Sequence, residues 1–340
     1  MNNFPSSSKS TPSANLHSKS IILDLQNISV DFVSETHPPA HAVTDVSFTL
    51  KEGEMLGLVG ESGCGKTTLM LSIMRLLPAA GRITAGKINF MGRDLLDLTD
   101  AGMNEIRWKN ISIIFQGAMN ALNPVRTIGD QIAEPIVHHI PGVTKQSLDE
   151  RIEELLELVG ISSNRKDQYP HQYSGGMRQR AMIAMALACF PQIVIADEPT
   201  TALDVMIQAQ ILELLDDLRH KLGISVILVT HDLGVVAEIC DSVLVMYGGV
   251  TAEYADVDNI YNNPHHPYTQ QLLRAFPDLT HPKERLIAIP GYPPQLNSLP
   301  PGCRFAPRCP QVFDRCNDES PQLFQINQIH QASCHLLDQR

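Results

Sequence analysis

Hydrophobic and polar positions form two kinds of pattern along most of this chain. Short apolar runs rich in β-branched residues have the length and composition of buried strands. Four such runs, EMLGLVG, ISIIFQ, QIVIADE and SVILVTH, begin at Glu54, Ile111, Gln192 and Ser225. Because helical patterns separate these runs between Ile21 and about Tyr254, the sequence predicts an α/β domain with a largely parallel central sheet.

Two helical segments repeat apolar residues every three or four positions and are predicted to cover the sheet. The first is expected to begin with a capping box formed by Ser147 and Glu150. Its apolar face consists of Ile152, Leu155, Leu156 and Val159. The second runs from about Val205 to Leu222, and its apolar face consists of Ile207, Ile211, Leu214, Leu215 and Leu218.

The pattern changes after Tyr254, where proline, asparagine and histidine become frequent and periodicity is lost. A chain of 340 residues also exceeds the usual domain size of roughly 100 to 200 residues. We therefore place a domain boundary near residues 255 to 280. The predicted parts are a disordered tail over residues 1–20, an α/β domain over 21–275 and an extension rich in proline and cysteine over 276–340.

Composition and charge exclude several classes of protein. A formal net charge of −11 argues against a nucleic-acid partner, because binding many phosphates requires clustered Lys and Arg. The longest apolar run, Ala181 to Ala196, is shorter than the roughly 20 residues needed to span a bilayer. The Ser-rich first twenty residues lack the apolar core of a secretory signal, and seven cysteines, an odd number, fit a reducing compartment. We expect a cytoplasmic protein.

The stretch GLVGESGCGKTTLM matches the phosphate-binding pattern GxxxxGK[ST] between an apolar strand and a helical run. Its backbone N–H groups are expected to surround the phosphates of a nucleotide. Lys66 is expected to reach the β and γ phosphates, and Thr67 to ligate Mg²⁺. The predicted cofactor-binding residues are Gly60, Glu61, Ser62, Gly63, Cys64, Gly65, Lys66, Thr67 and Thr68.

Two acidic residues follow the strand QIVIAD, at the edge of the sheet where open α/β sheets bind ligands. Asp197 is placed to hold Mg²⁺, and Glu198 to polarise a water for attack on the γ-phosphate. An acidic pair in this position is, by itself, more often a helix-capping turn. Together with the phosphate loop, it predicts a nucleoside triphosphatase.

A second glycine-rich helix start lies at HQYSGGMRQRAMIAMALA, which begins at His171. Ser174, Gly175 and Gly176 stand where an amphipathic helix begins, so they form a second candidate phosphate-binding helix start. One monomer seldom directs two such sites at one γ-phosphate. We therefore expect a head-to-tail dimer in which this turn of each chain closes over the nucleotide held by the other.

These motifs, in this order, resemble those of ABC transporter ATPase subunits over residues 21 to 275, with SGGMRQR similar to the family signature. The resemblance implies a P-loop NTPase with a RecA-like core, an antiparallel β subdomain and a helical subdomain. ATP is implied as the nucleotide, and the guanine-reading motif NKxD is absent from the sequence.

By the same resemblance, Gln116 corresponds to the glutamine that senses Mg²⁺ and contacts the membrane partner. Ala202, Leu203 and Asp204 correspond to the D-loop, and His231 to the switch histidine that contacts the γ-phosphate, so the implied catalytic residues are Lys66, Glu198 and His231. Phe32 is the candidate for stacking on adenine, with a core position as the alternative.

The segments FQGAMNALNP, SGGMRQR and NPHHPYTQQLLRAFP closely resemble those of ATPases from bacterial peptide and nickel uptake systems. The resemblance implies a peripheral protein at the cytoplasmic face of the inner membrane, bound to two permease subunits. A homologous second ATPase is the expected partner, with a homodimer as the alternative, and an extracytoplasmic protein delivers the solute.

This sequence departs from the subfamily pattern at a few positions. Gly117 and Ala118 replace the Asp-Pro pair that commonly follows the glutamine at Gln116. The sequence therefore does not define the exact contact with the permease. Tyr173 stands where the signature usually has Leu, and Thr201 replaces the common D-loop Ser. None of these departures removes a catalytic group.

Four cysteines lie in the last 38 residues, at Cys303, Cys309, Cys316 and Cys334. No CxxC pair is present, so their spacing fits a zinc knuckle poorly. Some members of the resembled subfamily carry a [4Fe–4S] cluster on cysteines of this tail, which predicts four cluster ligands here; unliganded thiols are the alternative. The histidines His265, His266 and His281 are predicted to belong to a docking loop in preference to a metal site.

The leading hypothesis is an ATPase that powers import of dipeptides, oligopeptides or a related solute through an ABC transporter. Import of nickel or a metal chelate is the first alternative. The second is a soluble ABC ATPase of DNA repair or translation, although the chain lacks the long coiled-coil insertion and the second ATPase unit typical of those proteins.

Overall fold

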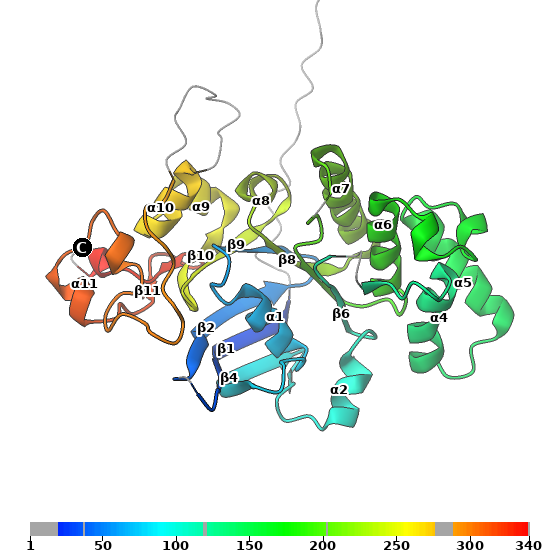
Figure 1. The fold of residues 1–340 in the computed structure, drawn as a ribbon, viewed down its shortest axis with the longest axis horizontal. Helices are drawn as coiled ribbons and strands as arrows, with labels where there is room; N and C mark the ends of the chain where they lie inside the picture. Colours follow the sequence, from blue (N-terminus) through cyan, green and yellow to red (C-terminus); the bar gives the residue numbers. More distant parts are fainter. Residues whose placement is uncertain (1–19, 37, 118–120, 202, 276–287, 339–340) are drawn as a thin grey trace, which may run out of the picture.

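The computed structural model describes residues 20–36, 38–117, 121–201, 203–275 and 288–338. Its centre is an eight-stranded sheet with strand order β11-β12-β10-β9-β3-β8-β7-β6 (Figure 1). Its parallel strands are β3 (Met55–Val59), β6 (Ile111–Ile114), β7 (Ile193–Asp197), β8 (Ser225–Thr230) and β9 (Ser242–Tyr247). The four strands predicted from the sequence are β3, β6, β7 and β8, so the predicted α/β class is confirmed.

The parallel strands divide their side chains between two hydrophobic clusters, because successive residues of a strand face opposite sides of the sheet. Met55 and Val59 of β3 belong to one cluster, whereas Leu56 and Leu58 belong to the other. All four are fully buried. Each such side chain stabilises the fold by roughly 1.5 to 3 kcal/mol, so the strand ends that carry polar residues rest on a rigid core.

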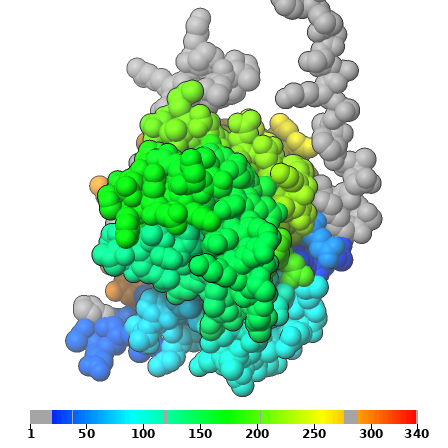
Figure 2. All heavy atoms as spheres, turned by 90° about the vertical axis from the view of Figure 1, so that its right-hand side faces the viewer, coloured from blue at the N-terminus to red at the C-terminus, as the bar shows by residue number. Residues whose placement is uncertain are grey.

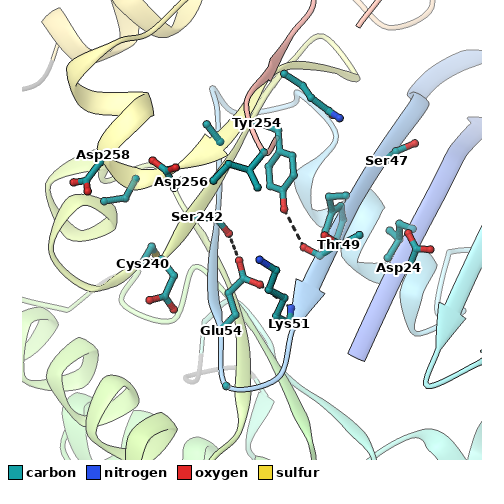
Figure 3. A pocket seen from close by; sticks show the side chains of 18 of the residues that line it. Asp24, Ser47, Thr49, Lys51, Glu54, Cys240, Ser242, Tyr254, Asp256 and Asp258 are labelled. Carbon is teal, nitrogen blue, oxygen red and sulfur yellow. Dashed lines mark hydrogen bonds between the residues drawn. The ribbon is translucent and has the colours of Figure 1, made fainter. Parts of the chain in front are cut away.

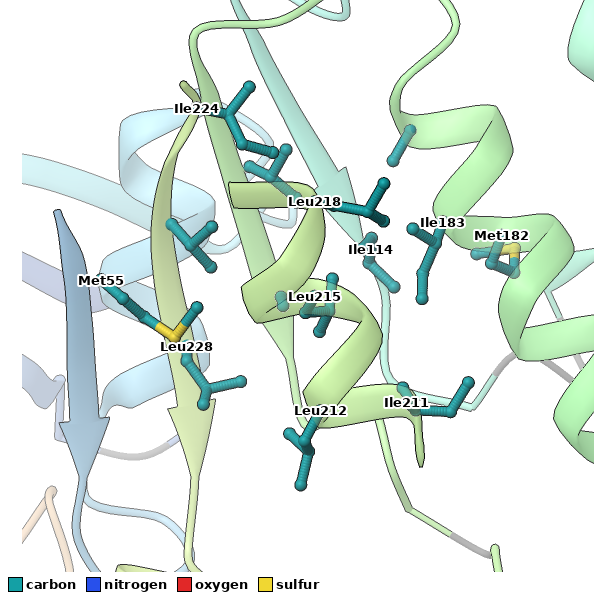
Figure 4. Close-up of a cluster of buried hydrophobic side chains, with 14 of the residues drawn as sticks. Met55, Ile114, Met182, Ile183, Ile211, Leu212, Leu215, Leu218, Ile224 and Leu228 are labelled. Atoms are coloured by element: carbon teal, nitrogen blue, oxygen red, sulfur yellow. The ribbon is translucent and has the colours of Figure 1, made fainter. Parts of the chain in front are cut away.

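The first cluster is covered by α7 (Val205–Leu222), which follows the periodicity expected from the sequence. Leu212, Leu215 and Leu218 of α7 pack over the sheet beside Met55 and Leu228 (Figure 4). Gly223 ends the helix with a left-handed backbone, φ 66°, which a residue without Cβ adopts without strain.

A second, antiparallel sheet covers the other cluster together with α1 (Lys66–Ile73). Its strand order is β2-β1-β4-β5 (Figure 1). The strands are β1 (Ile21–Phe32), β2 (Ala40–Lys51), β4 (Gly81–Phe90) and β5 (Arg93–Asp94). They are followed by the short helix α2 (Asp100–Ile106).

A helical unit projects from the β6 edge of the large sheet and forms the green face in Figure 2. Its helices are α4 (Ile128–His139), α5 (Lys145–Leu158) and α6 (Gly175–Ala186). The predicted capping box of α5 is wrong, because the helix begins one turn earlier. The Thr144 hydroxyl accepts a hydrogen bond from the Ser147 N–H, while the Glu150 carboxylate accepts one from the Gln146 side chain.

The chain after the parallel sheet folds back onto the core. Its elements are α8 (Leu233–Ile239), β10 (Val250–Asp256), α9 (Val257–Asn262), α10 (Pro267–Arg274), the 3₁₀ turn η4 (Ala306–Arg308), α11 (Asp314–Asp318), β11 (Phe324–Gln325), β12 (Gln331–Ala332) and the 3₁₀ turn η5 (His335–Leu337). β12 pairs antiparallel with β10, so the residues of the predicted extension complete the large sheet.

A buried carboxylate fixes this junction. Glu253 of β10 is fully buried and accepts hydrogen bonds from the backbone N–H groups of His265 (2.7 Å) and His266 (3.0 Å). The His330 ring nitrogen Nε2 lies 2.7 Å from the same carboxylate. Burial acts to raise the pKa of Glu253, but these hydrogen bonds, led by that of His330, hold the pKa below its ordinary value.

Across the residues that the structure describes, every helix is too short or too polar to cross a bilayer. The apolar run Ala181 to Ala196 is divided between the end of α6 and most of β7. The predicted tail lies outside the described residues apart from Ser20, and so do Ala118, Ala202 and His281.

Candidate nucleotide-binding site

The phosphate loop joins the end of β3 to the start of α1, as the sequence predicts. Gly60 and Gly65 have positive φ values of 149° and 102°. A Cβ at Gly60 would lie 2.2 Å from the Met246 carbonyl oxygen, and one at Gly65 would lie 2.3 Å from the Ala42 carbonyl oxygen. Both positions therefore require glycine, because any side chain would collide with backbone.

Lys66 is buried inside this loop, and its ammonium is directed at the loop's own carbonyls. Nζ donates to the carbonyl oxygens of Gly60 at 2.7 Å and Glu61 at 3.1 Å. A cation held at the centre of a ring of backbone groups is placed to meet phosphate oxygens. At the next position, Thr67 Oγ1 lies 3.4 Å from Asp197 Oδ1, so the loop and the end of β7 meet at these two oxygens.

The Thr67 hydroxyl and the Asp197 carboxylate suit Mg²⁺, which prefers oxygen ligands. Asp197 is the last residue of β7 and is almost fully buried. Burial raises the pKa of its carboxyl group, whereas the hydrogen bond from Thr67 lowers it. A nearby cation would favour the ionised form of this carboxylate, so the pair fits a metal bound beside the phosphates.

The Glu198 carboxylate lies close to two other predicted site residues, Gln116 and His231. Its carboxylate accepts hydrogen bonds from Gln116 Nε2 at 2.6 Å and Thr201 Oγ1 at 3.1 Å. His231 Nδ1 lies 3.7 Å from Oε1. Glu198 itself has a left-handed backbone, φ 45°, which is uncommon for a residue with a side chain. The strand ends of β6, β7 and β8 thus bring three polar side chains to one carboxylate.

The turn at Ser174, Gly175 and Gly176 is not part of this cluster. The Ser174 hydroxyl caps α6 by accepting from the Met177 N–H at 3.3 Å. A Cβ at Gly176 would lie 2.8 Å from Ile207 Cγ2, so the turn packs closely on α7. Figure 1 shows α6 in the helical unit, in a different part of the molecule from α1 and its phosphate loop.

Asp204 and Phe32 are the nucleotide candidates that lie outside the phosphate loop, the Glu198 cluster and the Ser174 turn. Asp204 caps α7, because its carboxylate accepts from the Ile207 N–H at 3.0 Å. Phe32 is the last residue of β1 and pairs with Ala40 on β2. Its ring packs beside Gly81, because a Cβ at Gly81 would lie 3.2 Å from Phe32 Cε1.

Three anchors of the phosphate loop were missed by sequence reasoning. The Glu61 N–H donates to the Tyr268 hydroxyl at 3.0 Å, and the Glu61 carboxylate is held by both Nη groups of Arg308, at 2.6 and 3.0 Å. The Cys64 carbonyl accepts from the Gly249 N–H at 3.0 Å. None of these contacts has a signal in the local pattern, because the partners lie far apart along the chain.

The four cysteines of the extension line one small cavity of about 20 Å³. Within the described ranges, no group of three or more His, Cys, Asp and Glu side chains is arranged to hold a metal ion, so the predicted iron–sulfur cluster is not supported by a preformed site. His266 is buried and its ring nitrogen caps α10, accepting from the Tyr268 N–H at 3.0 Å. Burial lowers the pKa of His266 to about 4, so it is neutral at physiological pH.

A cavity of about 870 Å³ lies at the opposite edge of the sheet, where β3 and β9 begin (Figure 3). Within it, Glu54 accepts a hydrogen bond from Ser242, and the Tyr254 hydroxyl donates to the Thr49 carbonyl at 3.1 Å. Burial raises the pKa of Glu54. The predicted phosphate-binding residues do not line this cavity.

Comparison with known families agrees with this geometry. The ABC transporter family model matches residues 43–201, and the model of the oligopeptide/dipeptide transporter C-terminal region matches residues 252–316. The chain is 47% identical to the probable peptide ABC transporter ATP-binding protein y4tR of Sinorhizobium fredii over 330 residues, which cover 96% of each protein. It is 48% identical to the dipeptide transport ATP-binding protein DppD of Bacillus subtilis over 322 residues, which cover 94% of this chain and 96% of that protein.

Solved structures give the same result. The dimeric, post-hydrolysis structure of the ATP-binding cassette MJ0796 bound to ADP and Pi has a TM-score of 0.62 and 28% identity, covering 69% of this chain and 98% of that chain. The structure of cbiO1 from Clostridium perfringens has a TM-score of 0.62 and 27% identity, covering 72% of this chain and 91% of that chain.

The fold and site define an ATPase of the P-loop type that binds ATP and Mg²⁺. The chain belongs to the ABC transporter family, among the ATP-binding proteins of its dipeptide and oligopeptide branch.

Proposed function

We propose that this chain hydrolyses ATP to power the import of dipeptides or oligopeptides. The relatives' names and the match to an oligopeptide/dipeptide transporter C-terminal region support peptides over nickel as the solute, and over a role in DNA repair or translation. The chain works at the cytoplasmic face of the inner membrane, bound to two permease subunits. An extracytoplasmic binding protein delivers the peptide.

The active unit is a head-to-tail dimer with a homologous ATPase. The observation that carries this proposal is the separation, within one chain, of the phosphate loop from the helix start at Ser174. Each chain has both halves of a site, but its own two halves lie in different parts of the fold. A second chain supplies the turn over the γ-phosphate, and hydrolysis then separates the two.

Exposed apolar side chains support two contact surfaces. Phe115 and Val125 flank the segment after β6, where the permease is expected to bind, and they are 41% and 79% exposed. Val205 and Met206 begin α7 beside the D-loop and are 79% and 73% exposed. Large apolar side chains this exposed suit burial against partner proteins, the first pair against a permease and the second against the other ATPase.

Within the site, Glu198 acts as the general base for the attacking water, Gln116 senses the Mg²⁺, and His231 contacts the γ-phosphate. Lys66 neutralises the β and γ phosphates, while Thr67 and Asp197 would hold a Mg²⁺ ion, which would supply further positive charge beside them. Most of the rate enhancement then comes from positioning and charge stabilisation.

The test is the Glu198→Gln variant in the assembled transporter. ATP binding is expected to persist, because Glu198 does not contact Lys66 or Thr67, whereas turnover is expected to fall by roughly 10² to 10⁴-fold, the usual contribution of a general base. Closed dimers should accumulate, which light scattering would detect. Glu213→Gln, an exposed position on α7, is the matched control. Hydrolysis near the wild-type rate would refute the role of Glu198.

The transported solute is tested separately, by uptake of labelled dipeptides, oligopeptides and nickel in cells with and without this chain. Loss of peptide uptake alone is the expected result. Loss of nickel uptake alone would replace the proposed solute while leaving the ATPase mechanism intact.

We also propose that the thiols of Cys303, Cys309, Cys316 and Cys334 hold a [4Fe–4S] cluster. They line one cavity, and the Gln311 N–H donates to Cys309 Sγ at 3.4 Å, a type of contact that stabilises cluster sulfurs. A four-iron cluster takes one thiolate at each iron, so its ligands need not converge on one point. A cavity of about 20 Å³ has room for about one water, so the thiols must move apart to admit the cluster.

Anaerobic purification is expected to give brown protein with about four irons and four sulfides per chain. Cys316→Ala should remove the colour, and Cys189→Ala, a buried core thiol, should retain it. Colourless wild-type protein without iron would exclude the cluster.

A further inference from the structure

Arg308, in the 3₁₀ turn between Cys303 and Cys309, uses all five of its N–H donors. Two of them form a fork on the Glu61 carboxylate, from Nη1 to Oε2 at 2.6 Å and from Nη2 to Oε1 at 3.0 Å. The other three donate to the Tyr247 hydroxyl (3.2 Å) and to the carbonyls of Pro290 (2.8 Å) and Ile289 (3.3 Å). The Arg308 side chain is 4% exposed and that of Glu61 27%, so water screens this pair weakly.

Glu61 is in turn connected on three sides. Its carboxylate binds Arg308, its N–H donates to Tyr268, and its carbonyl accepts from Lys66 Nζ at 3.1 Å. Lys66 is the residue that neutralises the phosphates. Glu61 therefore links Lys66 to the side chains of Tyr268 and Arg308, which both lie in the chain after β10.

Tyr268 and Arg308, the two side chains that hold Glu61, are themselves held in place by their neighbours. The rings of Tyr247, Tyr268 and Phe305 pack against one another, with centroid distances of 4.6 to 5.4 Å. Burial acts to lower the pKa of Arg308, but Glu61 and Tyr247 raise it above its ordinary value, so the guanidinium stays charged. The fork is thus held in one geometry before any nucleotide arrives.

We propose that Arg308 is a positioning residue for the phosphate loop, by which the C-terminal extension sets the affinity of the site for ATP. Arg308 does not touch the phosphates. It fixes Glu61, and through Glu61 the part of the loop that holds Lys66, in a conformation ready to bind. This inference rests on the proposed binding of ATP by the loop, and it assigns the extension a part in that binding.

The test compares nucleotide affinity and turnover in full-length variants. Arg308→Gln is expected to raise both the Kd for a fluorescent ATP analogue and the KM for ATP by roughly tenfold, which corresponds to the loss of one charge-assisted hydrogen-bond pair. The kcat should stay within about twofold, because Glu198 and Gln116 are untouched. Arg308→Lys keeps the charge without the fork and should lie between wild type and Arg308→Gln.

Arg315→Gln is the matched control, since Arg315 lies in the same extension but pairs with Glu319 and Asp338 at the surface. It should leave both constants unchanged. A role of Arg308 in folding alone would lower the active fraction, and hence kcat, with KM unchanged, and that result would overturn the proposal.

A double variant tests the route through Glu61. If Arg308 acts through this carboxylate, Glu61→Gln combined with Arg308→Gln should weaken ATP binding no more than either change alone, whereas independent effects would multiply. If the two losses of ATP affinity multiply, Arg308 does not act through Glu61. A wild-type chain that fails to bind ATP would instead refute the proposed function, whereas unchanged affinity in Arg308→Gln would refute the positioning role alone.

Discussion

Two helix starts in this protein, those of α1 and α6, are both rich in glycine but have different surroundings. The start of α1 is held from every side: Lys66 is folded into the loop, Thr67 reaches Asp197, and Glu61 is fixed by Arg308 and Tyr268. The start of α6 is capped by its own Ser174 and packs against Ile207 of α7. This contrast fits our proposal that the first turn holds the nucleotide and that the second meets a nucleotide held by another chain.

The difference teaches that similar local motifs acquire different functions through long-range contacts. Both turns present backbone N–H groups at the positive end of a helix. Only the first has a buried cation and an acidic strand end beside it. The comparison therefore predicts that changes at the start of α1 affect ATP binding by a single chain. Changes at the start of α6 should instead affect turnover by the dimer of two ATPase chains.

The largest effect is expected from Lys66→Ala. Removing the ammonium deletes the cation expected to bind the β and γ phosphates, so the affinity for ATP should fall by roughly 10² to 10³-fold. Titration of the purified full-length chain with a fluorescent ATP analogue measures this. Affinity within a few-fold of wild type would show that the loop is not the phosphate site.

Gly175→Asp should have the next largest effect and should separate the two helix starts. Among the described residues, a Cβ here meets Leu203 Cδ2 alone, at 3.4 Å, so the fold should tolerate the change. ATP affinity of one chain should be unchanged, while turnover by the assembled transporter should fall by about 100-fold, because the new carboxylate repels the partner's γ-phosphate. Gly102→Asp, near the start of α2, is the control. A loss of single-chain affinity would break the comparison.

Gly176→Ala tests the contact between α6 and α7. The added Cβ would lie 2.8 Å from Ile207 Cγ2, so we expect the free energy of unfolding to fall by about 1 to 3 kcal/mol from overpacking. Thermal denaturation of this variant beside Gly175→Ala, whose Cβ has ordinary contacts, provides the measurement. Equal stability of the two would indicate that α7 moves aside at no cost.

The smallest effect is expected from Ser174→Ala, which removes the α6 cap. Loss of an N-cap hydroxyl costs about 1 kcal/mol of stability. Denaturant unfolding should show this loss, with single-chain ATP affinity preserved. A change in affinity as large as that of Lys66→Ala would mean that the two turns serve the same nucleotide within one chain.

The sequence sufficed for the features that depend on local pattern. The strands β3, β6, β7 and β8 are short, apolar and buried on both faces, so their composition identifies them. The phosphate loop and the Asp197–Glu198 pair follow such strands at their carboxyl ends. The topology then brings Gln116 and His231 to Glu198, because parallel strands end at one edge of the sheet.

Features that depend on distant partners were not predictable. Arg308 and Tyr268 stand in segments without periodicity, and nothing near them indicates that both contact Glu61. The start of α5 was misplaced because Thr144 and Ser147 are both good capping residues, and the chain uses the earlier one. Single-residue choices of this kind are decided by packing against the rest of the fold.

The two-residue strand β12 covers part of one side of β10 and brings His330 onto the Glu253 carboxylate. If a protease removed the chain from His330 onward, β10 would lose its β12 neighbour and Glu253 would lose its contact with the His330 ring. Open edges of this type recruit strands from other chains. We therefore expect chains cleaved before β12 to aggregate more readily than the intact chain.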